Sequence, residues 1–420
     1  MLKPNLSRRD FLFQTTTGVL GLSLLSNSGL FPSLSTTARA NLIERQRNVF
    51  VVVFLRGGFD GLGLLCPRSG PDRVLYEAAR PTLALPLTGD NAALPLTDSF
   101  ALNRAAIPLQ SLFEKKRMAF IHACGLSTPS RSHFAAQLQV DLGNAKPGEF
   151  NSGWLTRFME ASPRKAAAIG PLSPASFLGT KNLFAFSRLK GLGLDGSEAR
   201  QRLLRTSLRN LYQASGEKGF YGQMALDMLD DLEDLGFKQL SKNLPDLPSA
   251  EMPQKFALAS HLIRNDPSLS LLTIDIGGWD THRQQGTQPD GYFYKQLATL
   301  SQTLSDFHHD MEATSNAWVT TLVFSEFGRR LKENASRGTD HGHGNVVLLS
   351  GPKVQGGQIY GQWPGLANDQ LFERSDLSVT TDLRHIFGEC LQHLDQNIAL
   401  EKIFSVVPKG EKKNLFIKTG

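Results

Sequence analysis

The sequence predicts an α/β protein, and two features of its apolar residues carry this prediction. Short runs rich in Val, Ile, Leu and Phe do not alternate with polar residues, which is typical of strands covered on both faces. Stretches of helical period lie between these runs, so strands and helices alternate along the chain. The pattern therefore predicts a central sheet flanked by helices on both faces.

Five apolar runs are predicted to be strands, at residues 49–55, 118–123, 270–276, 318–324 and 345–349. Amphipathic helices are expected at residues 223–242 and 292–313, with further helices starting near Ala135 and Thr381. His308, on the second of these stretches, is expected on the helix surface.

The segment at residues 146–248 differs in composition from the rest of the chain. It is richer in helix formers, Ser, Gly and Pro, which indicates a helical or loop insertion that caps the sheet. Apart from this insertion, residues 41–420 are expected to form a single α/β domain.

The first forty residues have the order of a signal peptide. Arg8 and Arg9 precede a mildly apolar stretch at residues 13–30, and small residues suited to cleavage follow at 38–40. The arginine pair resembles the twin-arginine consensus; a chance pair before an ordinary secretory leader is the alternative. We therefore expect export to the periplasm or the extracellular space through the twin-arginine (Tat) translocation machinery.

The charge balance and hydropathy exclude two classes of partner for the mature chain. Of the formal net charge of +6, the leader supplies +3, with Lys3, Arg8, Arg9 and Arg39 against Asp10. The remaining net charge of +3 is too small to indicate a surface that binds nucleic acid. No other stretch reaches the roughly 18 apolar residues that span a bilayer, so no stable membrane span is expected in the mature form.

Acidic and histidine residues follow most of the predicted strands. Because ligands in open α/β sheets bind beyond the carboxyl ends of the strands, these residues are candidates for one site. The candidate metal ligands are Asp60, Asp280, His282, Glu326, Asp340, His341 and His343.

Carboxylate and imidazole ligands without cysteine favour a divalent metal such as zinc or manganese. In extended backbone Asp280 and His282 project to the same side, as do His341 and His343. Asp60 and Glu326 would bridge or complete a second ion, and two ions would polarise a phosphoryl or sulfuryl oxygen. For Asp60 taken alone, a glycine-rich turn is the more ordinary interpretation.

A candidate nucleophile lies before the helix expected near Ala135. Ser132 stands between Arg131 and His133, where a helix N-terminus would favour an anion and Arg131 would hold its oxygens. A serine at this position is more often an N-cap, so both roles stay open.

Several motifs together resemble one protein family, DUF1501, whose members are exported bacterial proteins. The matching stretches are Phe54 to Gly61, Arg131 to Phe134, Gly277 to His282, Ser325 to Arg329, Gly338 to Gly344 and Gly351 to Gly357. The family is similar to the alkaline phosphatase and sulfatase superfamily. This resemblance implies a mixed, mostly parallel sheet, a two-metal site, Asp60, Asp280, His282, Glu326 and His341 or His343 as ligands, and Ser132 as nucleophile.

The sequence departs from the superfamily pattern at two places. Glu326 is followed by Phe327 where the superfamily has Asp-His, so one histidine ligand is missing or is supplied by His341. Residues 127–131 are similar to the sulfatase signature, which makes Ser127 an alternative nucleophile.

Two functions follow as hypotheses. The first is an exported metal-dependent hydrolase of phosphate or sulfate esters, acting on an anionic small molecule or glycan ester. The second is a non-catalytic cell-envelope binding protein on the same fold, favoured by the missing histidine.

Overall fold

The computed structural model describes residues 47–417 except 145, 147, 171–173, 181–182, 187–195, 408–411 and most of 220–250. The predicted leader lies outside the described residues, and the helix expected at 223–242 lies largely outside them. From Arg47 onward the described residues belong to one compact unit. No helix among them is long and apolar enough to cross a membrane.

A nine-stranded sheet forms the centre of the described structure. Its order is β13-β5-β12-β9-β1-β8-β6-β7, and β14 pairs with β5. All paired neighbours are parallel except β12, which runs antiparallel to β5 and β9. The predicted mixed, mostly parallel sheet is therefore confirmed. The strands are β1 (Arg47–Leu55), β5 (Met118–Gly125), β6 (Lys165–Ile169), β7 (Leu183–Phe186), β8 (Leu269–Ile276), β9 (Ala317–Phe324), β12 (Asn345–Ser350), β13 (Ile359–Tyr360) and β14 (Thr381–Asp382).

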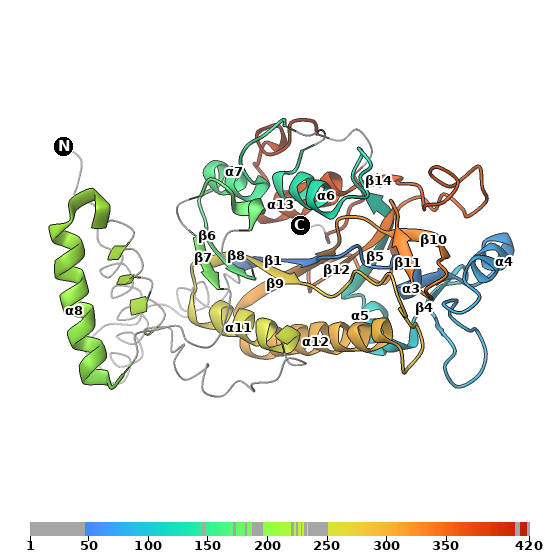
Figure 1. Ribbon diagram of the computed structural model, residues 1–420, viewed down its shortest axis with the longest axis horizontal. Coiled ribbons are helices and arrows are strands. Elements are labelled where there is room, and N and C mark those ends of the chain that lie inside the picture. The colour runs from blue at the N-terminus through green and yellow to red at the C-terminus, as the bar shows by residue number, and fades with distance from the viewer. Residues whose placement is uncertain are drawn as a thin grey trace, which may run out of the picture. The chain divides into compact units, whose positions relative to one another are not determined.

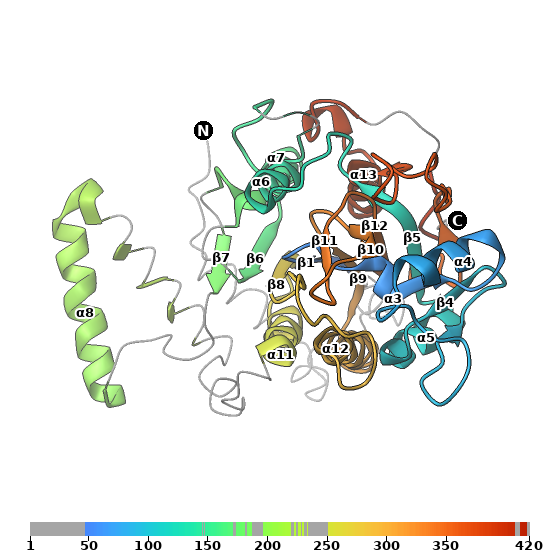
Figure 2. The same cartoon turned by 45° about the vertical axis from the view of Figure 1, so that its right-hand side comes forward.

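Helices cover both faces of this sheet, as Figures 1 and 2 show. One face carries α5 (Ile107–Glu114), α11 (Glu251–Asn265) and α12 (Tyr292–Thr314); the other carries α6 (His133–Leu142), α7 (Trp154–Ala161) and α13 (Leu383–Leu394). Strand β1 shows why its apolar run does not alternate. Val51 and Val53 belong to the core on one side, whereas Phe50 and Phe54 belong to the core on the other.

The segment predicted as a cap contributes two strands to the central sheet, which corrects that interpretation. Strand β6 pairs in parallel with β8 and with β7. Its sequence, Lys-Ala-Ala-Ala-Ile, favours a helix by local propensity, but burial beside β8 decides for a strand. The segment also includes α7, the described helix α8 (Glu198–Ala214), and the 3₁₀ turns η2 (Ala175–Phe177) and η3 (Gly216–Gly219).

Smaller elements surround the strand ends. They are α3 (Gly61–Leu64), α4 (Gly70–Ala79), η1 (Arg104–Ala106), η5 (Leu400–Lys402), the sheet of β2 (Leu65–Pro67), β3 (Leu94–Pro95) and β4 (Phe100–Leu102), and the hairpin of β10 (Arg329–Glu333) and β11 (Thr339–His341).

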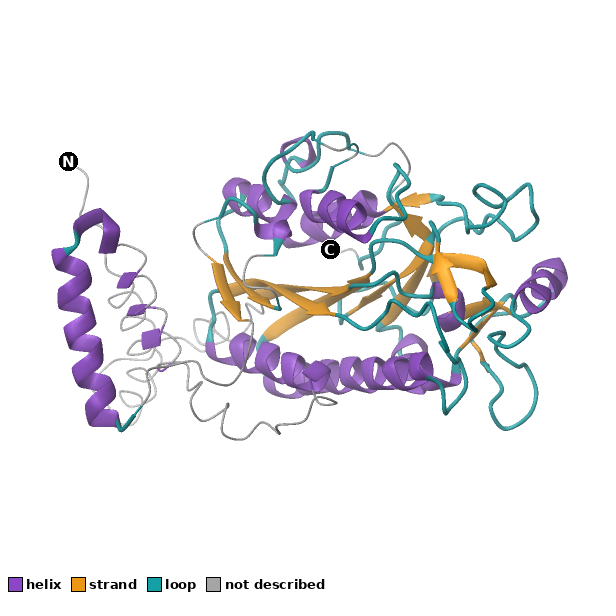
Figure 3. Cartoon of the chain, in the orientation of Figure 1, coloured by secondary structure: helices purple, strands orange, loops and turns teal. Residues whose placement is uncertain are grey.

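The sheet topology brings distant loops to one edge. Because β12 is antiparallel to its neighbours, its amino end lies at the same edge as the carboxyl ends of β1, β5, β8 and β9. The loops that follow those four strands therefore meet the loop that enters β12. Figure 3 shows loops and the β10–β11 hairpin gathered at one end of the sheet.

Candidate metal centre

Three histidines from different loops surround the carboxylate of Asp280. Asp280 and His282 follow β8, His341 ends β11, and His133 begins α6. The Nε2 atoms of His282 and His341 lie 3.0 Å and 3.2 Å from Asp280 Oδ1, and that of His133 lies 3.5 Å from Oδ2. His282 and His341 also bring their Nε2 atoms within 2.8 Å of each other.

Each of these imidazoles has its other nitrogen against an oxygen. The Nδ1 atoms of His133 and His282 lie 2.8 Å and 3.2 Å from carboxylate oxygens of Glu326 and Asp340. His341 Nδ1 lies 2.8 Å from the carbonyl oxygen of Arg131. An ionised carboxylate or a carbonyl can only accept, so each Nδ1 carries the proton. In a neutral ring the Nε2 lone pair is then free and faces Asp280, the arrangement that outer partners impose on metal-binding histidines.

The surroundings favour the ionised form of Asp280 and shift the pKa values of His133 and His341 in opposite directions. Burial opposes ionisation of Asp280, but the buried guanidinium of Arg329, which donates a hydrogen bond to it, outweighs burial and the pKa of Asp280 is lowered to about 2. Burial lowers the pKa of His341, which favours the neutral ring that a metal requires. The hydrogen bond to Glu326 raises the pKa of His133, so this ring takes up a proton more readily than His341 as pH falls.

These residues fit a divalent ion. His133, Asp280 and His341 each place one ligand atom within 4.8 Å of the others. Ligands at about 2.0–2.1 Å from a tetrahedral ion lie roughly 3.3 Å apart, close to the separations found around Asp280. The Nε2 atom of His133 is buried and has no hydrogen-bond partner among the residues that the structure describes, so in the neutral ring it has an unused lone pair near Asp280. The Asp280 side chain is 49% exposed, which leaves one side open to solvent.

A family model described as "Protein of unknown function (DUF1501)" matches residues 48–399. The chain belongs to the DUF1501 family. The matched range includes every residue of the cluster around Asp280. None of the curated proteins matches the chain.

In this DUF1501 chain Glu326 supports the candidate ligand His133 from behind and is not itself part of the cluster around Asp280. Its carboxylate is buried and accepts hydrogen bonds from the backbone amides of Gly57 and Gly58 and from Ser325 Oγ. Burial opposes its ionisation, but bonds from His133 and Gln137 lower its pKa to about 2. The motif Gly57-Gly58 thus forms a cradle of amides for Glu326, a role that the sequence did not reveal.

Asp60 lies outside the cluster, contrary to the expected ligand role. Its carboxylate is buried and forms a two-pronged ion pair with Arg80, at 2.7 Å and 3.0 Å, and also accepts from Gln285. Arg80 donates further bonds to the carbonyls of Leu331 and Arg330. Asp60 therefore ties the loop after β1 to strand β10.

Asp340 and His343 are not placed as direct ligands either. Asp340 stands behind His282 and accepts a bond from Asn334; that bond, with His282, lowers the pKa of Asp340. His343 is buried and its ring packs against Phe372, with centroids 4.7 Å apart. Strand β11 ends at His341 and the chain bends at His343, so the two side chains do not share one face as they would in a continuous extended strand.

The residues expected at the nucleophile occupy three different environments. Arg131 is ion-paired with Glu373 and Asp376, at 2.8 Å and 2.6 Å, so its guanidinium is engaged. Ser132 is the exposed N-cap residue of α6, and within the described residues its hydroxyl makes no hydrogen bond. Ser127 accepts a bond from Arg384 at 3.1 Å.

Sequence reasoning missed Arg329, which connects the loops of the cluster. It is fully buried and donates to the carbonyls of Gly57, Gly58, Trp279 and Thr339 as well as to Asp280. A buried arginine with this many partners is a structural anchor, and it neutralises part of the charge of Asp280. In the sequence, only its position at the end of the motif Ser325 to Arg329 pointed to Arg329.

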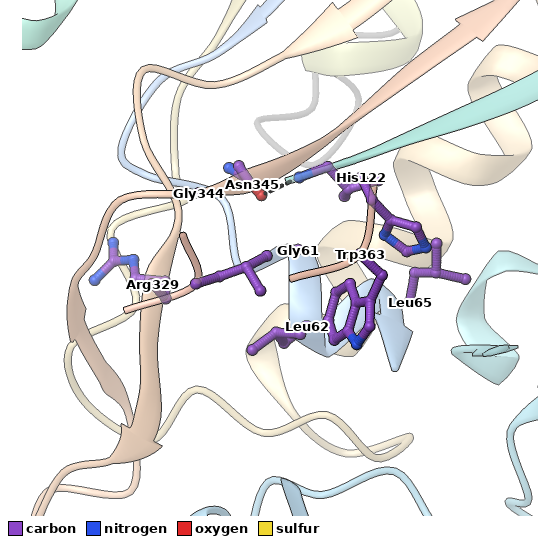
Figure 4. A pocket seen from close by; sticks show the side chains of 10 residues that line it. Gly61, Leu62, Leu65, His122, Arg329, Gly344, Asn345 and Trp363 are labelled. Atoms are coloured by element: carbon purple, nitrogen blue, oxygen red, sulfur yellow. Dashed lines mark hydrogen bonds between the residues drawn. The ribbon is translucent and has the colours of Figure 1, made fainter. Parts of the chain in front are cut away.

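Arg329 also lines a small cavity (Figure 4). Its lining includes Leu62, Leu65, Trp363 and the ring of His122. Burial lowers the pKa of His122 to about 3, so the ring is neutral, and its Nε2 atom has no partner among the described residues. His122 is thus a buried core residue that packs against Phe100 and Trp363.

Proposed function

We propose that this protein is an exported, divalent-metal-dependent hydrolase of phosphate or sulfate esters. One observation carries the proposal: three imidazoles present their Nε2 atoms to one ionised carboxylate, and each is held by an acceptor at Nδ1. Ligands oriented this way, with an exposed side, are typical of a catalytic metal site that keeps a position for substrate.

Zinc or manganese fits these nitrogen and oxygen ligands. His133, Asp280 and His341 would hold the ion, and His282 is placed to serve as a fourth ligand. When bound, the metal would polarise a phosphoryl or sulfuryl oxygen of the substrate. Since Asp60 is engaged with Arg80, the proposal is for one ion at this cluster rather than two.

The surroundings suit an anionic ester. Ser132, proposed as the nucleophile, precedes His133 directly and has an exposed, unbonded hydroxyl at the N-terminus of α6, which favours negative charge. Arg283 follows His282, is exposed, and has no ion-pair partner among the residues described. It is available to attract an anionic substrate.

A non-catalytic binding protein is the second candidate, and two observations favour it. No base is hydrogen-bonded to Ser132 within the described structure, and the charge of Arg131 is already balanced by Glu373 and Asp376. An anionic glycan or partner would then bind at the cluster without being cleaved.

Metal analysis of the purified protein, followed by assays with phosphate and sulfate monoesters, tests both candidates. We expect about one zinc or manganese per chain and ester hydrolysis that Ser132→Ala lowers by orders of magnitude while metal remains bound. Ser127→Ala is the matched control and should retain activity. Metal binding without turnover would support the binding protein, and a wild-type chain that binds no divalent metal would refute both versions of the site.

A further inference from the structure

Helix α6 carries a row of polar residues that faces the strand ends. His133, Gln137 and Asp141 are spaced by four residues, so they lie on one face of the helix. These side chains contact Glu326, which follows β9, and Arg56, which follows β1. The row therefore links the candidate ligand His133 to polar groups deeper at the sheet edge.

Gln137 connects two of these groups through opposite ends of its amide. Its Nε2 atom donates to Glu326 Oε1 at 2.7 Å, and its Oε1 atom accepts from Arg56 at 3.2 Å. A carboxylate can only accept and a guanidinium can only donate, so the amide has one possible orientation. The same Glu326 oxygen holds Nδ1 of His133.

Arg56 is itself held firmly, which fixes the far end of the amide. Its Nε atom donates to Asp275 at 2.7 Å and its guanidinium reaches Asp141 at 3.3 Å. The guanidinium also lies over the ring of Phe54, 4.1 Å from the centroid. Gln137 thus bridges a rigid cation and the carboxylate that orients His133.

We propose that Gln137 is a positioning residue for the metal ligand His133 and acts through Glu326. It holds the Glu326 carboxylate where Nδ1 of His133 donates to it, and it ties α6 to the ends of β1 and β9. This inference rests on the proposed metal centre, but it is independent of any hydrolytic activity.

A double-mutant cycle tests whether Gln137 acts through Glu326. Gln137→Met removes both bonds at nearly constant volume, and cobalt(II) titration, followed by its visible absorption, measures metal affinity. We expect a loss of roughly 10- to 100-fold, as for other outer partners of metal-binding histidines. In a Glu326→Gln background the same substitution should change affinity less than about threefold.

A second measurement does not need the metal. In ¹⁵N-histidine NMR spectra of the metal-free protein, wild-type His133 should show a protonated Nδ1 and a bare Nε2. Gln137→Met should shift the His133 tautomer signals and leave those of His282 and His341 in place. If Gln137→Met does not fold, Gln137→Asn, whose amide is too short for both bonds, serves in the same cycle.

Val140→Ala is the matched control, because it removes a buried group from α6 without touching the polar row. It should lower thermal stability and leave metal affinity and the His133 signals unchanged. Equal losses from Gln137→Met in both backgrounds, or His133 signals identical to wild type, would overturn the positioning role. A wild-type chain that binds no cobalt would refute the proposed function, while the NMR measurement would still show whether Gln137 orients His133 through Glu326.

Discussion

Asp60 and Asp280 both follow strands of the central sheet, but their surroundings differ. Asp60 is almost fully buried against Arg80, whereas Asp280 is half exposed among three imidazoles. A buried carboxylate paired with a buried guanidinium is a structural ion pair, since neither charge can be left alone without a large cost. The half-exposed carboxylate of Asp280 is the one accessible to the proposed metal and substrate.

Substitution of each aspartate by asparagine should separate these two roles. Asp280→Asn should weaken metal binding by at least the roughly 10- to 100-fold that loss of an outer partner costs, with a smaller effect on stability. Asp60→Asn should lower the free energy of unfolding by about 3–5 kcal/mol, because Arg80 stays buried without its counter-ion. Metal titration and urea unfolding of both variants measure this, and a metal-binding defect in folded Asp60→Asn would contradict the assignment.

Asp141 predicts a pH dependence of stability. Burial raises its pKa to about 7; Arg56 opposes this shift, and Asp275 adds to it. At pH values between 3.8, the ordinary pKa of an aspartate, and about 7, Asp141 holds a proton in the folded protein but has lost it in the unfolded chain. The free energy of unfolding contributed by this group therefore falls as pH rises from about 4 to about 7, by at most about 4 kcal/mol.

Asp141→Asn removes this titration, so its unfolding free energy should vary less than that of wild type over the same pH range. Urea unfolding at pH 4, 5, 6 and 7 provides the comparison. Parallel curves for the two proteins would show that Asp141 titrates normally.

At the scale of elements, the loop after β1 approaches the loop after β8 at van der Waals contact. Gly57 has φ of +121°, and a Cβ atom there would lie 2.6 Å from the backbone nitrogen of Asp280. The same glycine donates its amide to Glu326. Gly57 therefore allows the loop that cradles Glu326 to pack against the loop that carries Asp280.

Gly57→Ala should lower both stability and metal affinity. The left-handed φ alone costs about 1–3 kcal/mol, and the backbone contact adds to it by displacing Asp280. Gly89→Ala is the control, because Gly89 also has a positive φ, +84°, but has open space around it. Thermal unfolding and cobalt titration should show a stability loss in both variants and an affinity loss in Gly57→Ala alone; equal affinities would contradict this.

Helices and strands with strong patterns were predicted well, and those governed by distant contacts were not. The runs of β1, β8 and β9 are apolar enough to predict buried strands without knowledge of the neighbouring strands. Strand β6 is rich in alanine and becomes a strand because β8 and β7 flank it. His308, expected on the surface of α12, is buried and bonded to Ser350, because β12 lies where the helix pattern alone could not place it.

At the scale of the whole molecule, the proposed export assigns a role to the arginine pair of the leader that the sequence predicts. We expect replacement of Arg8 and Arg9 by lysine to abolish export, because the twin-arginine pathway reads that pair. Fractionation of cells that express the two versions, followed by detection of the chain in cytoplasm and periplasm, measures this. Unchanged export of the lysine version would favour an ordinary secretory leader.

Local pattern and residue chemistry were enough to predict the α/β class, the position of the candidate residues at the ends of strands, and nitrogen and oxygen as the candidate ligand atoms. The tertiary structure decided which residues converge: His133, Asp280, His282 and His341 meet, while Asp60 pairs with Arg80 and His343 packs against Phe372. Convergence depends on strand order and on the direction of β12, and side-chain roles depend on partners hundreds of residues away. Neither is encoded in the spacing of a single motif.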